Sequence, residues 1–447
     1  MNFEILLSIF GIIVAMVLLV ILVMRGINIF LIAFACTAVV AITGKINMYD
    51  AYKTNYMTGF VGFLQANFFV FLTGTLMGKA MEMTSGAKAI ARMLIKALGS
   101  DKALIAIPLA CGILGYGGVS AFVISFAVFP IALQVFHEAD LPRRFIPAAL
   151  CFGCSTFAMI APGAPQIHNA IIANALGTTI MAGAVNGFLS SGFMLVVGCI
   201  WLYKMVQKEK KKGAHFVAKD GDVFTSQENL PNGLIALIPL IVTVVIINIK
   251  NAEGKNILHL ETGLLIGTIL TMVLMHNFIK KSEISNELGN AIKSTVFSIT
   301  NTCAVVGFGS VVKGAAAFET IVKAMTDIPG PATLGLAIGT TVIAGICGSA
   351  SGGLGIAAPL LGPVFIAKGV DLGAVARIMA ISSSSLDSLP HNGYIVTVTN
   401  GVCNETHKDA YGPVFNLTVV VPFLGTLVGV LLFTCLLYTS DAADEED

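Results

Sequence analysis

The chain has 447 residues, of which 56% are hydrophobic and 11% are charged, against roughly 25% charged residues in an average soluble domain. The formal net charge is +1, and no basic, aromatic-rich tract indicates nucleic acid as a partner. Many windows exceed the ~18 apolar residues that span a bilayer. The sequence therefore predicts an all-α polytopic membrane protein whose main partner is the lipid bilayer.

The first half predicts five membrane crossings and one hairpin. The N-terminal apolar run, 5–24, lacks a basic region and a cleavage site, so we interpret it as a span and not as a signal peptide. The segment 103–136 is too long for one crossing and is broken by glycines, which predicts a re-entrant hairpin. The other predicted spans are 27–43, 59–81, 145–178 and 182–203, and 87–98 predicts an amphipathic helix.

The positions of the cysteines favour a packing role over a metal-binding or redox role. The nine cysteines are scattered through apolar segments. Cys151 and Cys154 form a CxxC pair, but no second pair or zinc-type histidine spacing accompanies it. We therefore expect no metal and no cofactor, and interpret these residues as small apolar packing residues.

A hydrophilic stretch, 204–231, separates the two halves. It carries six lysines by position 219, and basic residues near membrane ends mark the cytoplasmic side. We interpret it as a cytoplasmic linker between a first membrane repeat, 1–203, and a second, 232–434. The second repeat predicts spans at 233–249, 259–279, 292–312, 372–402 and 413–434, with an amphipathic segment at 317–325 and a hairpin at 332–367.

The C-terminal residues 435–447, CLLYTSDAADEED, depart abruptly from the preceding apolar run. Two origins are open for this tail. It resembles translated adapter sequence joined to the gene during DNA assembly, and the alternative is an ordinary acidic, disordered tail. Neither interpretation gives the tail a function.

Three landmarks recur in the same order in both halves. Gly117 and Gly352 are 235 residues apart, Leu141 and Leu372 are 231 apart, and the final pair, Pro162 and Pro390, is 228 apart. This indicates an internal duplication. Because each repeat contains five crossings, an odd number, the second repeat is predicted to insert upside down. Inverted repeats with broken helices are typical of secondary transporters.

Four apolar segments are interrupted by glycine, proline and polar residues, at 115–120, 155–166, 348–353 and 382–393. Non-helical backbone at membrane depth is tolerated only in the protein interior or beside a wet cavity, so we expect one site lined by both repeats. The alternative is close helix packing by small residues. The candidate substrate-binding residues are Gly117, Gly118, Ser120, Ser155, Thr156, Gln166, His168, Asn169, Ser349, Ser351, Ser384, Ser385, His391 and Asn392.

Asp387 is the candidate coupling residue. A carboxylate within the membrane is costly unless paired, and the first repeat has no acid at the aligned position, Ala158. We predict that Asp387 carries the coupling proton or binds a coupling cation; a helix cap is the alternative. His168 and His391 could each move a proton or donate to a substrate carboxylate, but an ordinary hydrogen-bonding role is the interpretation we favour over proton transfer. Each is followed by an asparagine, Asn169 or Asn392, and this recurring His-Asn pair favours a role in substrate binding.

Arg377 precedes Asp387 by ten residues, which is about 15 Å along a helix. Two interpretations are open. Its guanidinium could bind a substrate carboxylate, or it could extend to the membrane interface. The second interpretation is the one we favour.

The segments ALCFGCSTFAMIAPGAPQIHNAIIANALGTT and SSSSLDSLPHNGYIVTVTNGVCNETHKDAYGP resemble the gluconate:proton symporter family and its citrate, butyrate and hydroxybutyrate permease relatives. The resemblance implies import of a small organic anion coupled to H⁺, with Na⁺ as the alternative ion. It also implies a homodimer in the bacterial cytoplasmic membrane, two hairpins, and alternating access of elevator type. No strongly basic residue lies inside either of the two breaks in these segments, which favours a monocarboxylate or short hydroxy acid over a tricarboxylate.

The residues disfavour three other functions. A sodium/proton antiporter usually needs more than one buried carboxylate, and only Asp387 is evident. An intramembrane serine hydrolase would use a serine in a GxSxG-type context, which the breaks lack, so no enzymatic activity is predicted. A channel is disfavoured because inverted broken helices are typical of alternating access.

Overall fold

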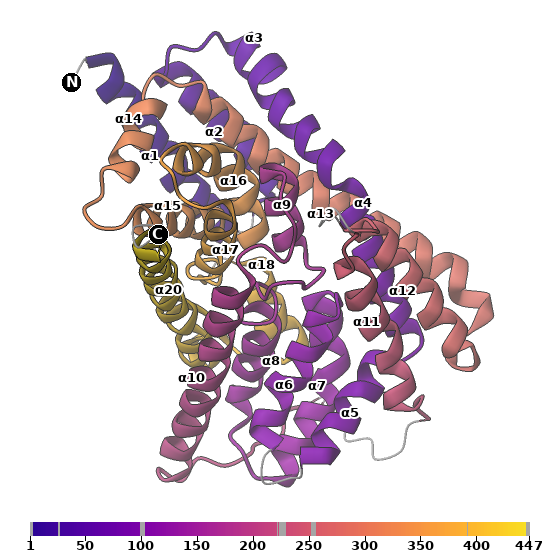
Figure 1. Cartoon of the computed structure of the whole chain (residues 1–447). Helices are drawn as coiled ribbons and strands as arrows, with labels where there is room; N and C mark the ends of the chain where they lie inside the picture. Colours follow the sequence, from indigo (N-terminus) through magenta and orange to yellow (C-terminus); the bar gives the residue numbers. More distant parts are fainter. Residues whose placement is uncertain are drawn as a thin grey trace.

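The structure is a computed structural model that describes residues 3–25, 27–98, 103–220, 222, 229–251, 256–390 and 392–443. Within these ranges the chain forms helices and no β-strand (Figure 1), which confirms the predicted all-α polytopic fold. Six segments of the described chain are long and apolar enough to cross a membrane. They are Met48–Met83, Ala121–Glu138, Ala184–Lys210, Ile284–Lys313, Ala350–Ala367 and His407–Cys435.

The helices of the second half repeat those of the first in the same order. The first half contains α1 (Phe3–Met24), α2 (Ile29–Thr43), α3 (Met48–Asp50), the π-helix η1 (Ala51–Tyr56), α4 (Met57–Met83), α5 (Gly86–Leu98), α6 (Ala103–Tyr116), α7 (Ala121–Glu138), the 3₁₀-helix η3 (Arg143–Phe145), α8 (Ile146–Ser155), α9 (Ile167–Leu176) and α10 (Ala184–Lys210). The second half contains α11 (Gly233–Asn248), α12 (Leu260–Leu274), the 3₁₀-helices η4 (His276–Phe278) and η5 (Lys281–Glu283), α13 (Ile284–Lys313), α14 (Phe318–Thr326), α15 (Ala332–Cys347), α16 (Ala350–Ala367), α17 (Leu372–Ser383), α18 (Gly393–Val396), the π-helix η6 (Thr397–Val402), α19 (His407–Phe415), the π-helix η7 (Asn416–Val420) and α20 (Val421–Ala443).

The two repeats run in opposite directions. Their third long helices, α4 and α13, pack against each other over most of their length. A Cβ on Gly59, near the start of α4, would lie 2.2 Å from the hydroxyl of Ser310, near the end of α13. At the other end, Lys79 Nζ lies 2.9 Å from a carboxylate oxygen of Glu287. Equivalent helices are therefore antiparallel, as an inverted duplication requires.

Both predicted hairpins are present, and they lie at opposite ends of the molecule. Figure 1 shows α6 and α7 in its lower part and α15 and α16 in its upper part. The first hairpin turns at Gly118, with φ +92°, where a Cβ would lie 2.8 Å from the ring of Pro165. The second turns at Gly348, with φ +57°. Both turns use the left-handed region that glycine adopts without strain.

The segment that follows α10 is tied to both repeats by a buried ion cluster. Arg143, in the α7–α8 connection, donates to Asp222 at 2.7 Å, to Glu405 and to the carbonyl of Cys403. Lys219 adds a second bond to Glu405 at 2.8 Å. Burial alone would lower the pKa of Arg143, but its bonds to Asp222 and Glu405 outweigh burial and raise that pKa above its ordinary value.

We expect Arg143→Met to lower the stability of the folded protein by about 3 kcal/mol, because it removes the cation of buried Asp222 and one of the two cations of buried Glu405. The measurement is the thermal unfolding midpoint in detergent. The control is Arg144→Met, which removes a partly exposed pair with Glu209 and should change stability by about 1 kcal/mol or less. Equal shifts for the two variants would contradict a structural role for the cluster.

Candidate functional site

The first broken segment, between α8 and α9, has its backbone satisfied by side chains from elsewhere in the fold. Each of the five successive carbonyls of residues 160–164 accepts a side-chain hydrogen bond. The donors are Arg377 to Ile160 (2.5 Å), Asn169 to Ala161 (2.9 Å) and Ala164 (3.1 Å), Tyr116 to Pro162 (3.0 Å), and Asn248 to Gly163 (3.2 Å). Unwound backbone at membrane depth is stable only with such partners.

The second broken segment, between α17 and α18, is braced in a similar way. Asn392 donates its side-chain amide to the carbonyl of Asp387 at 2.8 Å, and the hydroxyl of Tyr411 donates to the carbonyl of Ser388 at 3.1 Å. The Asn392 oxygen accepts from the backbone of Ile395 and so caps α18. The two breaks are therefore fixed loops and not frayed helix ends.

A cavity of about 270 Å³ lies where the hairpin turns and the two breaks meet. This volume is close to the ~300 Å³ lower end of small-molecule pockets. Nine of the predicted site residues line it, from both repeats. They are Gly118, Ser120, Ser155, Gln166, His168, Ser349, Ser351, Asp387 and Asn392.

Three helices begin at this cavity and direct their N-termini into it. Ser120, Gln166 and Ser349 are the N-cap residues of α7, α9 and α16, and all three line the cavity. The Ser349 hydroxyl accepts from the backbone of Gly352, but no side chain of the described chain caps α7 or α9. The described lining residues include no lysine or arginine, so these helix ends are its source of positive potential.

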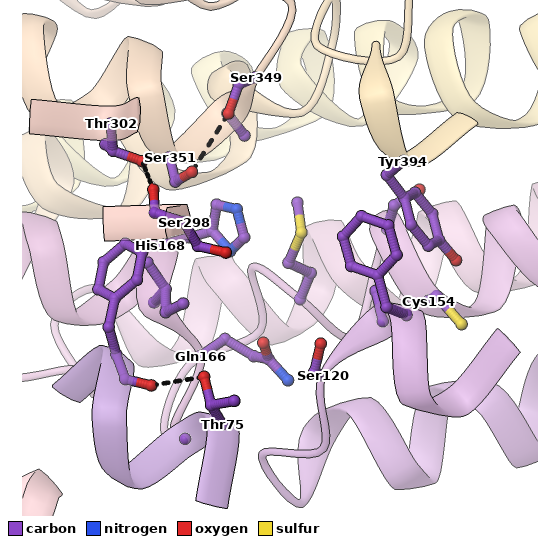
Figure 2. A pocket seen from close by; sticks show the side chains of 18 of the residues that line it. Thr75, Ser120, Cys154, Gln166, His168, Ser298, Thr302, Ser349, Ser351 and Tyr394 are labelled. Carbon is purple, nitrogen blue, oxygen red and sulfur yellow. Dashed lines mark hydrogen bonds between the residues drawn. The ribbon is translucent and has the colours of Figure 1, made fainter. Parts of the chain in front are cut away.

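Hydroxyl groups outside the broken segments complete the lining, and sequence reasoning missed them. Thr75 lies on α4, and Ser298 and Thr302 lie on α13. Figure 2 shows Thr75 near Gln166 on one side of the cavity, with Ser298 and Thr302 on the opposite side. All three lie in unbroken apolar spans, where the i, i+4 pair Ser298 and Thr302 was the available sequence signal.

Asp387 is buried in the cavity wall, with 5% of its surface exposed. Its Oδ1 accepts a hydrogen bond from the hydroxyl of Ser388 at 2.9 Å. It is the only carboxylate among the described lining residues, and no histidine, cysteine or carboxylate cluster in the described chain could hold a metal ion. A carboxylate in this position can bind and release a proton or bind a monovalent cation.

The two candidate histidines differ in what the structure shows. His168 is the second residue of α9 and lines the cavity, and its Nδ1 is buried without a hydrogen-bond partner among the described residues. A bound ligand or water could supply that partner. His391 lies outside the described residues.

Five predicted site residues do not line the cavity, and each has a packing or bracing contact instead. Gly117 packs on Leu240, where a Cβ would lie 2.8 Å from the leucine Cβ. The others are hydrogen-bonded side chains: Thr156 to Phe152 O, Asn169 to the first break, Ser384 to Ile381 O, and Ser385 to Thr426. These contacts explain why the breaks are rich in small polar residues that do not face a ligand.

The two His-Asn pairs do not occupy equivalent places. Asn392 is the N-cap of α18, whereas Asn169 is the third residue of α9, which starts after Gln166. Gln166 is therefore the positional equivalent of Asn392. Its amide donates to the carbonyls of Gly115 and Val119, and so connects the first break to the first hairpin.

The interfacial interpretation of Arg377 is wrong. Its side chain is only 2% exposed. The guanidinium donates to the carbonyls of Ile160, Ile180 and Ala182 and to the side-chain oxygen of Asn169. Arg377 does not line the cavity; it holds the backbone of the first break in place.

Comparisons with known proteins agree with this architecture. No protein-family model matches the chain. The uncharacterized transporter YxjC of Bacillus subtilis (strain 168) is 28% identical over 438 residues, covering 89% of this chain and 92% of that protein. An uncharacterized transporter of Haemophilus influenzae (strain ATCC 51907 / DSM 11121 / KW20 / Rd) is 23% identical over 368 residues, covering 81% and 83%.

Two solved structures share the fold. The YdaH transporter of Alcanivorax borkumensis, described as having an unusual topology, matches with a TM-score of 0.60 at 16% identity, covering 87% of this chain and 88% of that one. MtrF of Neisseria gonorrhoeae, described within a class of antimetabolite efflux pumps, matches with a TM-score of 0.52 at 15% identity, covering 85% and 82%. The relatives and the fold support a multi-pass membrane transporter. Membership of the gluconate:proton symporter family stays a prediction.

We expect Arg377→Lys to lower the unfolding free energy by about 3 kcal/mol, because a lysine cannot replace the planar fork and leaves buried carbonyls without donors. The thermal unfolding midpoint in detergent measures this change. Arg25→Lys is the control, since Arg25 is exposed at the end of α1. An unchanged midpoint for Arg377→Lys would contradict the bracing role.

Proposed function

We propose that the protein is a secondary active transporter that moves a small organic anion by cation-coupled symport. The observation that carries this proposal is the convergence of three helix N-termini and several hydroxyl groups on a small cavity whose described lining holds no lysine or arginine. Free N–H groups at the starts of α7 and α9 suit a carboxylate. Serine and threonine hydroxyls suit the hydroxyls of a short gluconate-, hydroxybutyrate- or citrate-like acid.

Asp387 is the proposed coupling residue, with H⁺ as the coupling ion and Na⁺ as the alternative. Asp387 and the substrate carboxylate share one cavity of about 270 Å³. Two negative charges at such short range repel each other. A cation bound to Asp387 therefore strengthens binding of the anion, and a bound anion strengthens binding of the cation. This reciprocal coupling is what symport requires.

The transport cycle and the membrane orientation belong to the same proposal. The antiparallel pair α4 and α13 would form part of a scaffold, and the hairpins and breaks would move against it in an elevator-type exchange. We propose a homodimer in the bacterial cytoplasmic membrane, with the linker on the cytoplasmic side, as the basic residues of the linker favour. A sodium/proton antiporter is the alternative; the single carboxylate among the described lining residues disfavours it.

The decisive experiment is uptake into proteoliposomes under imposed proton or sodium gradients, with a panel of labelled monocarboxylates, hydroxy acids and tricarboxylates. We expect accumulation of a short hydroxy or carboxylic acid under a proton gradient. Cation exchange without uptake of any carboxylate would overturn symport in favour of the antiporter.

Asp387→Asn should abolish gradient-driven accumulation while substrate exchange across the membrane continues, because an amide fills the same space but carries no proton or cation. Exchange and driven uptake are measured on the same proteoliposomes. The control is Asp371→Asn, which changes a carboxylate outside the cavity to another good cap of α17. Unchanged gradient-driven uptake by the Asp387→Asn variant would show that Asp387 does not couple transport to the cation.

Gly74→Leu should weaken substrate binding at least tenfold without lowering stability. Gly74 lines the cavity, and a Cβ there would meet no atom of the described chain within 4 Å, so the side chain enters the substrate's space. Binding is followed by calorimetry with the transported acid, and stability by the unfolding midpoint. Gly192→Leu, which adds a side chain in open space on α10, is the control; equal affinity of the two variants would place the substrate elsewhere.

A further inference from the structure

A second cavity, of about 260 Å³, lies outside the candidate site and is bounded by α4, α9, α13 and α16. Its lining mixes apolar residues with four polar ones, Thr58, Asn67, Asn174 and Ser310. Polar groups on helix faces at membrane depth are unfavourable against lipid. Their presence indicates a space that water or a polar solute enters.

The two cavities follow one another along the same helix faces. On α4, residues 58, 59, 62, 63, 66 and 67 line the second cavity, and residues 70, 71, 74 and 75 line the candidate site. This spacing is one face of a helix. The other three helices behave alike: on α13, Ser298 and Thr302 line the site and Val306 and Ser310 line the second cavity. On α9, His168 is followed by Asn174, and on α16, Ser351 is followed by Pro359.

The path along this face is long enough to reach from the site to the end of the molecule. Thr58 and Thr75 are 17 residues apart on α4, which is about 25 Å along a helix axis. The hydrocarbon core of a bilayer is about 30 Å thick. The second cavity therefore leads from the candidate site toward the end where α4 begins and α13 ends.

Two contacts separate the cavities. The buried rings of Phe63, which lines the second cavity, and Phe71, which lines the site, meet edge to face with centroids 6.2 Å apart. Phe63 also packs across the gap on α16, where a Cβ on Gly355 would lie 3.0 Å from its ring. One turn along α4 from Phe63, Asn174 of α9 donates to the Asn67 side chain at 3.2 Å and to the carbonyl of Ala66 at 3.0 Å.

We propose that the second cavity is the vestibule through which the small organic anion reaches the candidate site, and that Phe63 and Phe71 form its gate. The hydrogen bonds of Asn174 to α4 hold α9 in the closed position. This inference rests on the proposed function for the identity of the solute. The access path itself can be tested without any substrate.

The first test measures access to the vestibule. Gly62 lines it, and a Cβ there would meet no atom of the described chain within 4 Å, so Gly62→Cys fits without strain. Eight native cysteines are buried and Cys435 is exposed, so the background is Cys435→Ser. The probe is an anionic methanethiosulfonate, present on both sides of the proteoliposome membrane. The cysteine thiolate attacks its sulfenyl sulfur, forms a mixed disulfide and releases methanesulfinate.

Gly62→Cys should react at least tenfold faster than Phe69→Cys. Phe69 is 62% exposed on α4 and lines neither cavity, so the matched control faces lipid, where the charged probe and the thiolate are both disfavoured. Equal rates would overturn the vestibule, because a lipid-filled crevice predicts the same slow reaction at both positions. Fast labelling of Gly62→Cys without uptake of any carboxylate would support the vestibule as an access path. It would contradict the proposal that the transported solute is an organic anion.

The second test measures the gate with a native reporter. Cys154 lines the candidate site and is 3% exposed. Phe63→Ala should join the two cavities and raise the labelling rate of Cys154, located by mass spectrometry, at least tenfold over the parent protein. Phe69→Ala is the control and should leave the rate unchanged.

Because Phe63→Ala could also loosen the fold, Asn174→Ala provides a second route to opening. Asn174 is exposed, so its replacement removes the two bonds to α4 without leaving a cavity in the core. We expect at least a threefold rise in Cys154 labelling with an unchanged unfolding midpoint. An unreactive Cys154 in both variants would overturn the gate.

Discussion

The structure depends on one constraint, which is that unwound backbone inside a membrane must find hydrogen-bond partners within the protein. The carbonyls of residues 160–164 meet it through donors on α6, α9, α11 and α17. Two of these donors, Asn248 and Arg377, belong to the second repeat. The first repeat therefore cannot form its broken segment alone, and the two halves must fold around each other.

The same constraint decides which polar residues are available to a ligand. Asn169, Ser384 and Ser385 bond to the protein, so their polarity is used in forming the breaks. What remains for an anion is the backbone at the starts of α7, α9 and α16 together with hydroxyls on their cavity faces. The repeats differ here, since α16 is capped by its own serine while α7 and α9 have no side-chain cap in the described chain. In the proposed symport, the first repeat would bind the carboxylate and the second would supply Asp387.

Much of the architecture could be predicted because it follows from short, local sequence patterns. The hairpin at 103–136 and the hairpin at 332–367 follow from length and glycine position, and the structure places them at α6–α7 and α15–α16. Nine of the predicted residues line the cavity, and they were predictable because glycine and polar residues at a helix break are a local signal. Arg377 could not be placed, because its role comes from three carbonyls about 200 residues away in the chain. Thr75 and Thr302 were missed because each lies in an unbroken apolar span, where only the packing of α4 and α13 shows which face meets the cavity.

Helix α9 connects the separate parts of the proposed cycle. Its first turn carries His168 at the site, its third residue braces the first break, and its last turn holds Asn174 against α4. All three lie on one helix of 10 residues, so in the proposed cycle they would move together. The Asn169 side chain also accepts a hydrogen bond from Arg377. A shift of α9 would therefore alter the bonds that brace the first break and the bonds of Asn174 at the gate at the same time. In the proposed cycle, substrate contact at the start of α9 would be coupled through this one helix to the bonds of Asn174 at its end, which is the link that alternating access needs.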